Sequence, residues 1–378
     1  KKATELLKQY GFERIKAADM IDSYNFEDRK LVEIVKATYF NPKIVVIDET
    51  TTALSQEGRE ELYKHMERIR KSGNTVIFIS HDLPEIIEKS DTITILRDGV
   101  YIDTVKSKDV NENDLKKLMV GREVTGDYYR SDYGEKVSDE VVLSVKDVTV
   151  PGLIENVSFD LHKGEILGFG GLSESGMHEI GKAIFGASYD REGTVELADG
   201  TQINDIPTAI KHSIAYTSKD RDNESVVLNQ SIGDNICLPS LDELSGPAHL
   251  ISDKKKKDFA NKFAKQMSVK MVDVNQFVSN LSGGNKQKVV LARWIGKDSD
   301  IVVLDSPTRG IDIKVKQDIY QLMNQMRKNG KSIIMISEEL MELIGMCDRI
   351  MIMKDGKISG ELERDQNLDE NGLITMMV

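Results

Sequence analysis

The sequence predicts an α/β protein made of two similar copies of one unit, each with a buried, mainly parallel sheet between helices. Apolar runs rich in β-branched residues, such as IVVID, TVIFIS and TITILRDG, alternate with helical patterns such as QEGREELYKHMERIRKSG and LPEIIEK. This alternation is typical of βαβ units. The chain has 378 residues, more than one hydrophobic core usually serves, so two domains are expected.

The two copies are recognised by three pairs of segments that match without gaps at an offset of 257 residues. The pairs are PKIVVIDETTTALS (42–55) with SDIVVLDSPTRGID (299–312), ISHDLPEI (79–86) with ISEELMEL (336–343), and LRDGVYIDTV (96–105) with MKDGKISGEL (353–362). If the copies were only two generic αβ units with similar strands, three separate pairs of segments would not be expected to match at the same offset. The matches therefore indicate an internal duplication.

The first copy is expected to be incomplete. Residue 1 corresponds to residue 258, whereas the second copy begins near Val141, so the first copy would lack an equivalent of residues 141–257. The chain also opens in a helical pattern, KKATELLKQYGF, without a Met. Between the copies, GREVTGDYYRSDYGEKVSDE (121–140) is polar and poor in aliphatic residues, which predicts a linker or exposed crossover.

The second copy begins with three successive strand patterns, VVLSVKDVTV, LIENVSFDLH and EILGFG. They suggest an antiparallel β-subdomain beside the α/β core. Further on, DKKKKDFANKFAKQM (253–267) has helical composition, and its four lysines predict a solvated helix face rather than a nucleic-acid contact.

Composition excludes several classes. The formal net charge of −12 argues against a nucleic-acid scaffold, for which excess Lys and Arg is expected. No apolar run approaches the roughly 20 residues that span a bilayer. Cys237 and Cys347 stand in apolar surroundings without a CxxC partner, which predicts buried thiols in a reducing compartment.

Polar residues follow two neighbouring strands of the first copy. Asp48 and Glu49 end one apolar run, and His81 ends another 33 residues after Asp48. In an α/β sheet, ligands gather beyond the carboxyl ends of the strands. There, an aspartate can hold Mg²⁺ through water, a glutamate can polarise a water that attacks a phosphate, and a histidine can reach that phosphate. Chance strand and helix ends are the alternative for each residue alone.

The second copy has a candidate phosphate-facing helix start in LSGGNKQKVVLARWI (281–295). Two glycines leave backbone N–H groups open to an anion, and Ser282 adds a hydroxyl. The positive end of the following helix faces the same place. An ordinary Gly-Gly turn is the alternative, which the strand ending in Asp305 shortly afterwards disfavours.

A third stretch, GGLSESGMHEI, has the outline of a phosphate cradle but lacks its lysine and hydroxyl. Met177 and His178 occupy those positions. The stretch is either a weakened nucleotide loop or a plain strand-turn-helix corner, and the sequence leaves both open. His178 has no nearby partners in the sequence that would make it a metal ligand.

These motifs together resemble those of ATP-binding cassette (ABC) ATPases. LSGGNKQK resembles their signature motif, IVVIDET their Walker B strand and ISHD their switch histidine. The two-copy layout, with KGEILGFGGL, DSPTRGIDI and the RDG and KDG hairpins, resembles the tandem ATPase subunit of ribose, galactose and xylose importers. A close branch of that family handles nucleosides.

The resemblance implies two tandem nucleotide-binding domains, each with a P-loop α/β core, an antiparallel β-subdomain and a helical subdomain. Residues 1–120 would be the C-terminal part of the first domain, without its Walker A loop. Residues 121–140 would be a linker, and residues 141–378 the second domain. The two domains would sandwich two ATP molecules head to tail, each held by one copy's loop and the other's signature.

Site one would then be competent. It would combine the first copy's phosphate loop with Asp48 holding Mg²⁺ through water, Glu49 as the catalytic base and His81 as the switch. The second copy would supply its signature residues, which are Leu281, Ser282, Gly283, Gly284 and Asn285.

Site two would be degenerate. Its signature, by the offset, is Tyr24-Asn25-Phe26-Glu27-Asp28, which has no glycine. The second copy's part would comprise Gly171, Gly176, Met177, His178, Asp305, Ser306 and Glu338. Ser306 replaces the catalytic glutamate, Glu338 the histidine, and Lys219 the acidic or amide residue of the Q-loop. We therefore expect that site two does not hydrolyse ATP.

The resemblance implies a peripheral ATPase subunit at the cytoplasmic face of the cell membrane. It would drive import of a sugar or nucleoside through transmembrane permease subunits, with a periplasmic or lipoprotein solute-binding protein as an indirect partner. Segment 218–241 would face the permease. Two alternatives stay open, a non-catalytic docking or regulatory chain and a soluble ABC ATPase acting on ribosomes or nucleic acid. The sequence does not reveal the solute.

Overall fold

The computed structural model describes most of the chain as two compact units, Lys1–Thr125 and Gly126–Val378. Each unit is considered by itself. The described residues are 2–24, 26–48, 50–51, 54, 56–80, 82–97, 100–120, 128–132, 136–172, 174–246, 250–311, 313–365 and 368–377.

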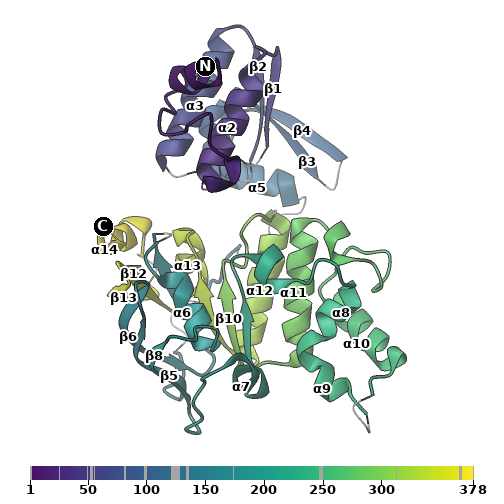
Figure 1. The fold of residues 1–378 in the computed structure, drawn as a ribbon. Helices are drawn as coiled ribbons and strands as arrows, with labels where there is room; N and C mark the ends of the chain where they lie inside the picture. Colours follow the sequence, from purple (N-terminus) through teal and green to yellow (C-terminus); the bar gives the residue numbers. More distant parts are fainter. Residues whose placement is uncertain are drawn as a thin grey trace. The chain divides into compact units, whose positions relative to one another are not determined.

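The first unit is a two-stranded parallel sheet with helices on one face and a separate antiparallel hairpin (Figure 1). The buried core between sheet and helices includes Phe12, Leu31, Ile47 and Leu62. The strands are β1 (Ile44–Asp48), β2 (Thr75–Ile79), β3 (Thr92–Arg97) and β4 (Val100–Lys106). The helices are α1 (Lys2–Gln9), η1 (Ile21–Ser23), α2 (Phe26–Thr38), α3 (Gln56–Lys71), α4 (Leu83–Lys89), η3 (Ser107–Asp109) and α5 (Glu112–Val120).

The second unit is built on a six-stranded sheet in the order β13-β12-β7-β11-β10-β9. Its strands run parallel except for the antiparallel edge strand β13. They are β7 (Ile166–Gly171), β9 (Ile214–Thr217), β10 (Ile301–Asp305), β11 (Ser332–Ile336), β12 (Arg349–Lys354) and β13 (Lys357–Glu363). The inner strands β7, β10 and β11 are buried at every position, as expected for a parallel sheet covered on both faces.

A second sheet, antiparallel and three-stranded, consists of β5 (Val141–Val150), β6 (Ile154–His162) and β8 (Glu192–Leu197). The antiparallel subdomain expected from the sequence is confirmed for its first two strands. The third predicted strand, EILGFG, is different, because β7 pairs in parallel with β11 and β12 at the centre of the main sheet. Its glycines fit there because Gly168 and Gly170 leave room for Leu343 and Cys347.

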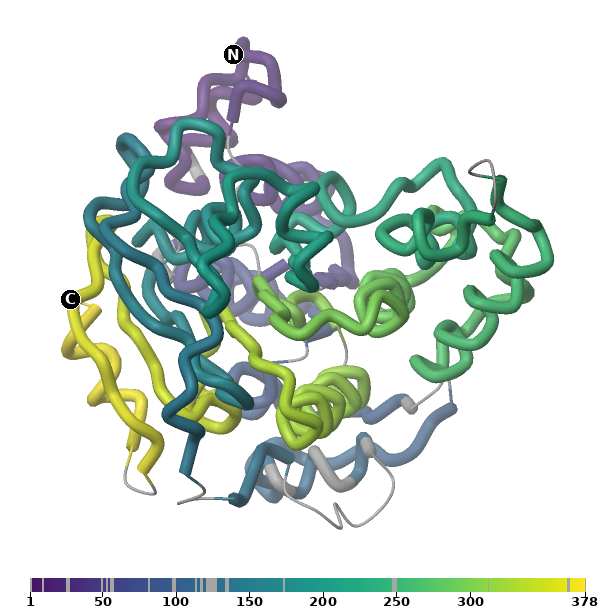
Figure 2. Tube along the Cα trace, turned by 90° about the horizontal axis from the view of Figure 1, so that it is seen from below, coloured from purple at the N-terminus to yellow at the C-terminus, as the bar shows by residue number. Residues whose placement is uncertain are grey.

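The helices of the second unit divide into two groups, with α8, α9 and α10 gathered at the side opposite the antiparallel sheet (Figure 1). The C-terminal strand β13 lies beside β6 (Figure 2). The helices are α6 (Met177–Ile184), α7 (Ile206–Lys211), η4 (Arg221–Ser225), α8 (Ile232–Cys237), η5 (Leu238–Ser240), α9 (Leu241–Leu244), α10 (Asp253–Gln266), η7 (Val278–Asn280), α11 (Gly283–Lys297), α12 (Ile313–Lys328), α13 (Leu340–Met346) and α14 (Glu370–Met377).

The repeat seen in the sequence recurs in the strand pairing. Ile44 pairs with Thr75 in the first unit, and Ile301 pairs with Ser332 in the second, each shifted by 257. The hairpins β3–β4 and β12–β13 share the same register, with an irregularity at equivalent positions. The duplicated segments therefore fold alike residue by residue.

Burial of these equivalent strands differs. Ile44, Val46, Ile77 and Ile79 of the first unit are 45–59% exposed. All residues of β10 and β11 are buried, because β7 and β9 flank them and helices cover both faces. In the described part of the first unit, β1 and β2 pair only with each other.

Part of the segment expected as a linker packs on the second unit. Arg130 is 4% exposed and donates to the Met346 carbonyl (2.7 Å) and to Asp348 (2.7 Å). Tyr128 packs edge-on against Tyr320 and Tyr129 packs against it at a tilt, at 5.5 and 5.3 Å between ring centroids. Residues 128–132 therefore belong to the packing of this unit.

Two simpler expectations are confirmed. Residues 253–266 form α10, and three of its four predicted lysines, Lys254, Lys255 and Lys257, are exposed, whereas Lys256 is partly buried and donates to Asp234. Both cysteines are free and buried. None of the helices that the structure describes is long and apolar enough to cross a membrane.

Candidate functional site

The stretch that resembles a phosphate cradle forms the corner between β7 and α6. Gly176 begins the helix with φ 91° and ψ 0°, a left-handed conformation that favours glycine. A Cβ there would lie 2.6 Å from the Leu153 carbonyl oxygen, and a Cβ at Gly171 would lie 2.7 Å from that of Met353. The turn between β7 and α6 is thus fixed by close backbone packing.

Met177 does not reach toward a ligand. Its side chain is fully buried and belongs to the hydrophobic core of the second unit. A lysine at this position would have to direct its ammonium out of that core. Met177 is therefore a packing residue of this unit.

His178, the second residue of α6, makes contacts that sequence proximity did not reveal. Its Nδ1 lies 2.7 Å from Oδ1 of Asp305, the last residue of β10, which is 1% exposed. Its Nε2 lies 3.4 Å from Glu338, just after β11. The parallel strands bring these residues to one edge of the sheet from positions 127 and 160 residues away.

Lys219 completes the group. It follows β9 and precedes η4, a π-helical turn, and its ammonium donates to Glu338 at 2.6 Å. The same Nζ lies 3.1 Å from His178 Nε2. We call Asp305, His178, Glu338 and Lys219 the ionic network.

Two further hydroxyls reach Asp305. Ser306 Oγ donates to Oδ1 at 3.3 Å and Tyr216 OH to Oδ2 at 3.4 Å. Burial and the nearby Asp305 carboxylate raise the pKa of Tyr216 well above its ordinary value, so the phenol keeps its proton. Both carboxylate oxygens of Asp305 are therefore occupied by protein donors.

The charge of His178 follows from its partners. Burial lowers the pKa of the imidazole, but the hydrogen bonds to Asp305 and Glu338 outweigh burial and raise the pKa above its ordinary value. The network therefore favours the protonated imidazole, which balances the carboxylates.

The Gly-Gly helix start of the second unit has the geometry expected of a phosphate-facing site. Leu281 is anchored in the core, and Ser282 precedes the first turn of α11 and is exposed. The Ser282 hydroxyl accepts from Asn285 Nδ2 at 3.0 Å and does not cap the helix, so it leaves the first-turn N–H groups uncapped. A Cβ at Gly283 would lie 3.2 Å from Arg221, whereas Gly284 is half-buried.

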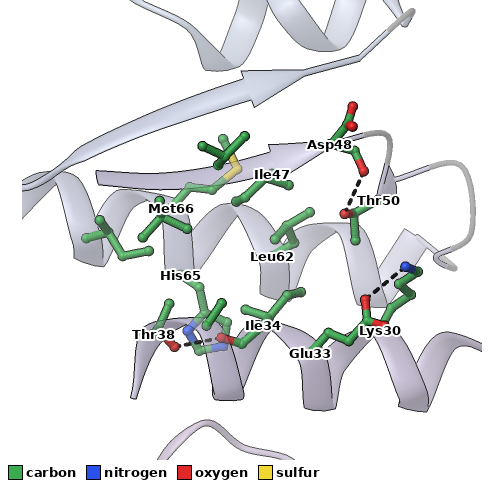
Figure 3. Close-up of a pocket in the computed structure, with 14 residues that line it drawn as sticks. Lys30, Glu33, Ile34, Thr38, Ile47, Asp48, Thr50, Leu62, His65 and Met66 are labelled. Atoms are coloured by element: carbon green, nitrogen blue, oxygen red, sulfur yellow. Dashed lines mark hydrogen bonds and ion pairs between the residues drawn. The ribbon is translucent and has the colours of Figure 1, made fainter. Parts of the chain in front are cut away.

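In the first unit, Asp48 ends β1 and is exposed. Among the described residues, no hydrogen bond or ion pair reaches its carboxylate, and Thr50 bonds only its backbone carbonyl, at 3.3 Å (Figure 3). Glu49 and His81, the predicted base and switch, lie outside the described residues. Asp48 thus differs from Asp305, whose oxygens are both engaged.

A cavity of about 250 Å³ extends from Asp48 and Thr50 along β1, between α2 and α3 (Figure 3). His65 lines it, 3% exposed, and neither ring nitrogen has a hydrogen-bond partner among the described residues. Burial lowers the pKa of His65, which favours the neutral imidazole.

The position equivalent to a signature in the first unit holds acidic residues, as the sequence indicated. Asp28, in the first turn of α2, is 8% exposed and accepts from Arg14 at 2.8 Å. Asn25 lies outside the described residues. By the offset of 257, Asp28 stands at the position of Asn285, and Phe26 and Glu27 stand where α11 has Gly283 and Gly284.

Known proteins resemble the chain in sequence. The family model described as ABC transporter matches residues 154–309. The ribose import ATP-binding protein RbsA of Clostridium tetani is 38% identical over 341 residues, which cover 90% of this chain and 67% of that protein. The xylose import ATP-binding protein XylG of Thermoanaerobacter pseudethanolicus is 43% identical over 345 residues, 89% of this chain and 68% of that protein.

The chain belongs to the family of sugar-import ATP-binding proteins of ABC transporters.

Solved structures agree on the fold of this ABC protein. The dimeric structure of a bacterial ABC transporter cassette matches with a TM-score of 0.52 at 22% identity, covering 59% of this chain and 99% of that chain. A post-hydrolysis state of an ATP-binding cassette, bound to ADP and Pi, matches with the same score. At this identity the likeness establishes an ABC ATPase α/β fold and no more.

Each unit of the ABC protein also contains its own copy of a buried set of hydrogen bonds that sequence analysis missed. In the second unit, the Glu342 carboxylate accepts hydrogen bonds from the hydroxyls of Thr308, Tyr320 and Ser337. We call this arrangement the hydroxyl clamp. In the first unit, at the same offset of 257, Glu85 accepts from Thr51, Tyr63 and Ser80.

The clamp joins the loop after β10 to helix α13 in the second unit, and the segment after β1 to helix α4 in the first. All four residue types are identical in both copies, and that identity was the available signal. It was hard to interpret because hydroxyl and carboxylate residues at strand and helix ends have many local uses. Only the fold brings them to one point.

Proposed function

We propose that this chain is the ATP-hydrolysing part of a sugar or nucleoside importer, with one competent composite ATP site and one degenerate site. It works as a peripheral subunit at the cytoplasmic face of the membrane. There it acts on transmembrane permease subunits, to which a solute-binding protein delivers the solute. Sequence identity of 38–43% to ribose and xylose import ATP-binding proteins supports this assignment. Selectivity for the solute belongs to the permease and the solute-binding protein.

The observation that carries the asymmetry is the contrast between the two Walker B aspartates. Asp48 is exposed, and no described residue binds its carboxylate. Asp305 is buried and engaged by His178, Ser306 and Tyr216. An unengaged carboxylate fits Mg²⁺ held through water, because Mg²⁺ takes oxygen ligands and keeps several waters.

The competent site combines Asp48, Glu49 and His81 with the signature Leu281–Asn285. Bound Mg²⁺ supplies charge neutralisation on the phosphates. Glu49 orients and polarises the attacking water, and His81 contacts the terminal phosphate. The uncapped start of α11 and the Ser282 hydroxyl bind phosphate oxygens through N–H and O–H groups.

The proposal includes a tandem layout. Residues 1–120 are the C-terminal part of a first ATPase domain, residues 121–140 a connection, and residues 141–378 the second domain. Support comes from the strand register and the hydroxyl clamp, both repeated at an offset of 257. Closure of the domains on ATP and reopening after hydrolysis would move the permease.

The test measures ATP hydrolysis and solute uptake by the natural protein that contains this chain, assembled with its permease in vesicles. Glu49→Gln removes the general base and is expected to lower hydrolysis by about 10²–10⁴-fold. Ser306→Ala, the equivalent change at the degenerate site, is expected to leave hydrolysis within about twofold. Wild-type hydrolysis by Glu49→Gln, or its loss in Ser306→Ala, would contradict the proposal.

A further inference from the structure

We propose that the ionic network is a built-in substitute for Mg²⁺ and nucleotide at the corner between β7 and α6. His178 and Lys219 bind the carboxylates of Asp305 and Glu338 and thereby connect, without a ligand, the segments that a bound Mg-nucleotide would connect in a competent site. This inference takes from the proposed function only the assignment of the corner as a former nucleotide site.

The first step is that Mg²⁺ does not fit. Mg²⁺ requires oxygen ligands in near-octahedral geometry. At this corner the hydroxyl position is His178, whose ring nitrogen lies 2.7 Å from Asp305, and the other oxygen of Asp305 accepts from Tyr216. A metal would have to displace a buried imidazole from a carboxylate that is 1% exposed.

The second step is that the basic side chains are matched to the acidic ones. Asp305 and Glu338 supply two carboxylates, and His178 and Lys219 supply two bases. His178 lies between the carboxylates, and Lys219 contacts both Glu338 (2.6 Å) and His178 (3.1 Å). The group is therefore internally compensated, which the buried Asp305 carboxylate requires, whereas the Lys219 and Glu338 side chains are 26% and 35% exposed.

The third step concerns what the network joins. Its members come from α6, from the end of β10, from the segment after β11 and from the turn between β9 and η4. In P-loop NTPases, a nucleotide and its metal bridge the phosphate loop and the Walker B strand. Here the bridging groups are side chains of the protein itself, so the corner stays assembled without a ligand.

The test measures thermal unfolding of the second unit in the full chain. The signal is the fluorescence of Trp294, the single tryptophan, and the quantity compared is the midpoint temperature. Trp294 is buried in this unit and packs on Phe185 at the end of α6, at 5.9 Å between ring centroids. The wild-type midpoint is expected to shift by less than about 1 °C on adding 10 mM Mg²⁺ alone, because a ligand stabilises only a state that binds it.

The double variant H178S/K219Q removes both bases and restores a hydroxyl. Its midpoint is expected to fall by roughly 6–20 °C, because a buried carboxylate loses its partner. Mg²⁺ should then raise the midpoint by several degrees, beyond the effect of NaCl at matched ionic strength. His162→Ser, which removes a histidine 3.2 Å from buried Glu165 elsewhere in the unit, is the control that Mg²⁺ should not rescue.

Two results would overturn the proposal. One is a wild-type Trp294 midpoint that rises with Mg²⁺ by several degrees. The other is a double variant as stable as wild type. If the double variant does not fold, Lys219→Gln decides, since loss of the ammonium's ion pair with Glu338 must lower the midpoint while wild type stays indifferent to Mg²⁺. Neither result depends on ATP hydrolysis, so failure here is distinguishable from failure of the proposed function.

Discussion

Tyr320→Phe tests the hydroxyl clamp with the removal of one oxygen atom. Tyr320 is 2% exposed and its hydroxyl donates to Glu342, which is 1% exposed. Burial and the Glu342 carboxylate raise the pKa of Tyr320 far above its ordinary value, so the phenol is a donor at all working pH values. The substitution therefore removes one charge-assisted hydrogen bond and leaves the ring packing in place.

The expected loss follows from that contact. A hydrogen bond to a charged group contributes about 1.5–3 kcal/mol. The remaining hydroxyls of Thr308 and Ser337, together with Lys316 at 3.5 Å, still compensate Glu342, so the full penalty of an isolated buried charge does not apply. We expect the free energy of unfolding of the second unit to fall by about 1.5–3 kcal/mol.

The assay is urea unfolding followed by Trp294 fluorescence, with the slope of the transition unchanged. Tyr189→Phe is the matched control, because Tyr189 is 91% exposed in the same unit and its loss should change stability by less than about 0.5 kcal/mol. A Tyr320→Phe variant that unfolds together with wild type would refute the view that the clamp stabilises this unit.

Three further outcomes follow from the same unit. The folded state raises the pKa of His178, so the stabilisation by the protonated imidazole is complete below about pH 6.5 and is lost as pH rises through the pKa of the folded state. The unfolding midpoint followed by Trp294 should therefore fall from pH 6 to 9, and it should fall less in His178→Gln. Gly176→Ala should lower the Trp294 midpoint in urea, because its Cβ would lie 2.6 Å from the Leu153 carbonyl at a left-handed φ. In the native protein, a thiol reagent should modify neither buried cysteine at neutral pH, since burial raises the pKa of Cys237 to about 11 and that of Cys347 further; mass spectrometry after brief labelling measures this.

Sequence patterns predicted the strands and the duplication well, because β-branched runs and their spacing are local properties. IVVID and IVVLD form β1 and β10 at equivalent positions. The same pattern could not predict that β10 is buried at every position and β1 at alternate ones. That difference depends on whether neighbouring strands and covering helices are present, and those elements lie far away in the sequence.

The candidate site shows the same limit. The motif spacing identified Met177, His178, Ser306 and Glu338 as altered positions and Asp305 as retained, but it found no nearby partner that would make His178 a metal ligand. Its partners come from 127 and 160 residues away, and only the parallel sheet brings them to one edge. Lys219 was interpreted as a loss, whereas in the structure it forms a new contact with Glu338.

The ionic network also bears on the history of the second unit. Changing His178 back to a hydroxyl would leave Asp305 buried without its base, and changing Lys219 alone would take the ammonium from Glu338. Each single reversion costs stability before any catalytic gain arises, because a metal site needs all the positions at once. Under the proposed function, single substitutions would not restore a catalytic centre at this corner, and divergence of this unit would follow routes that keep the four residues together or replace them jointly.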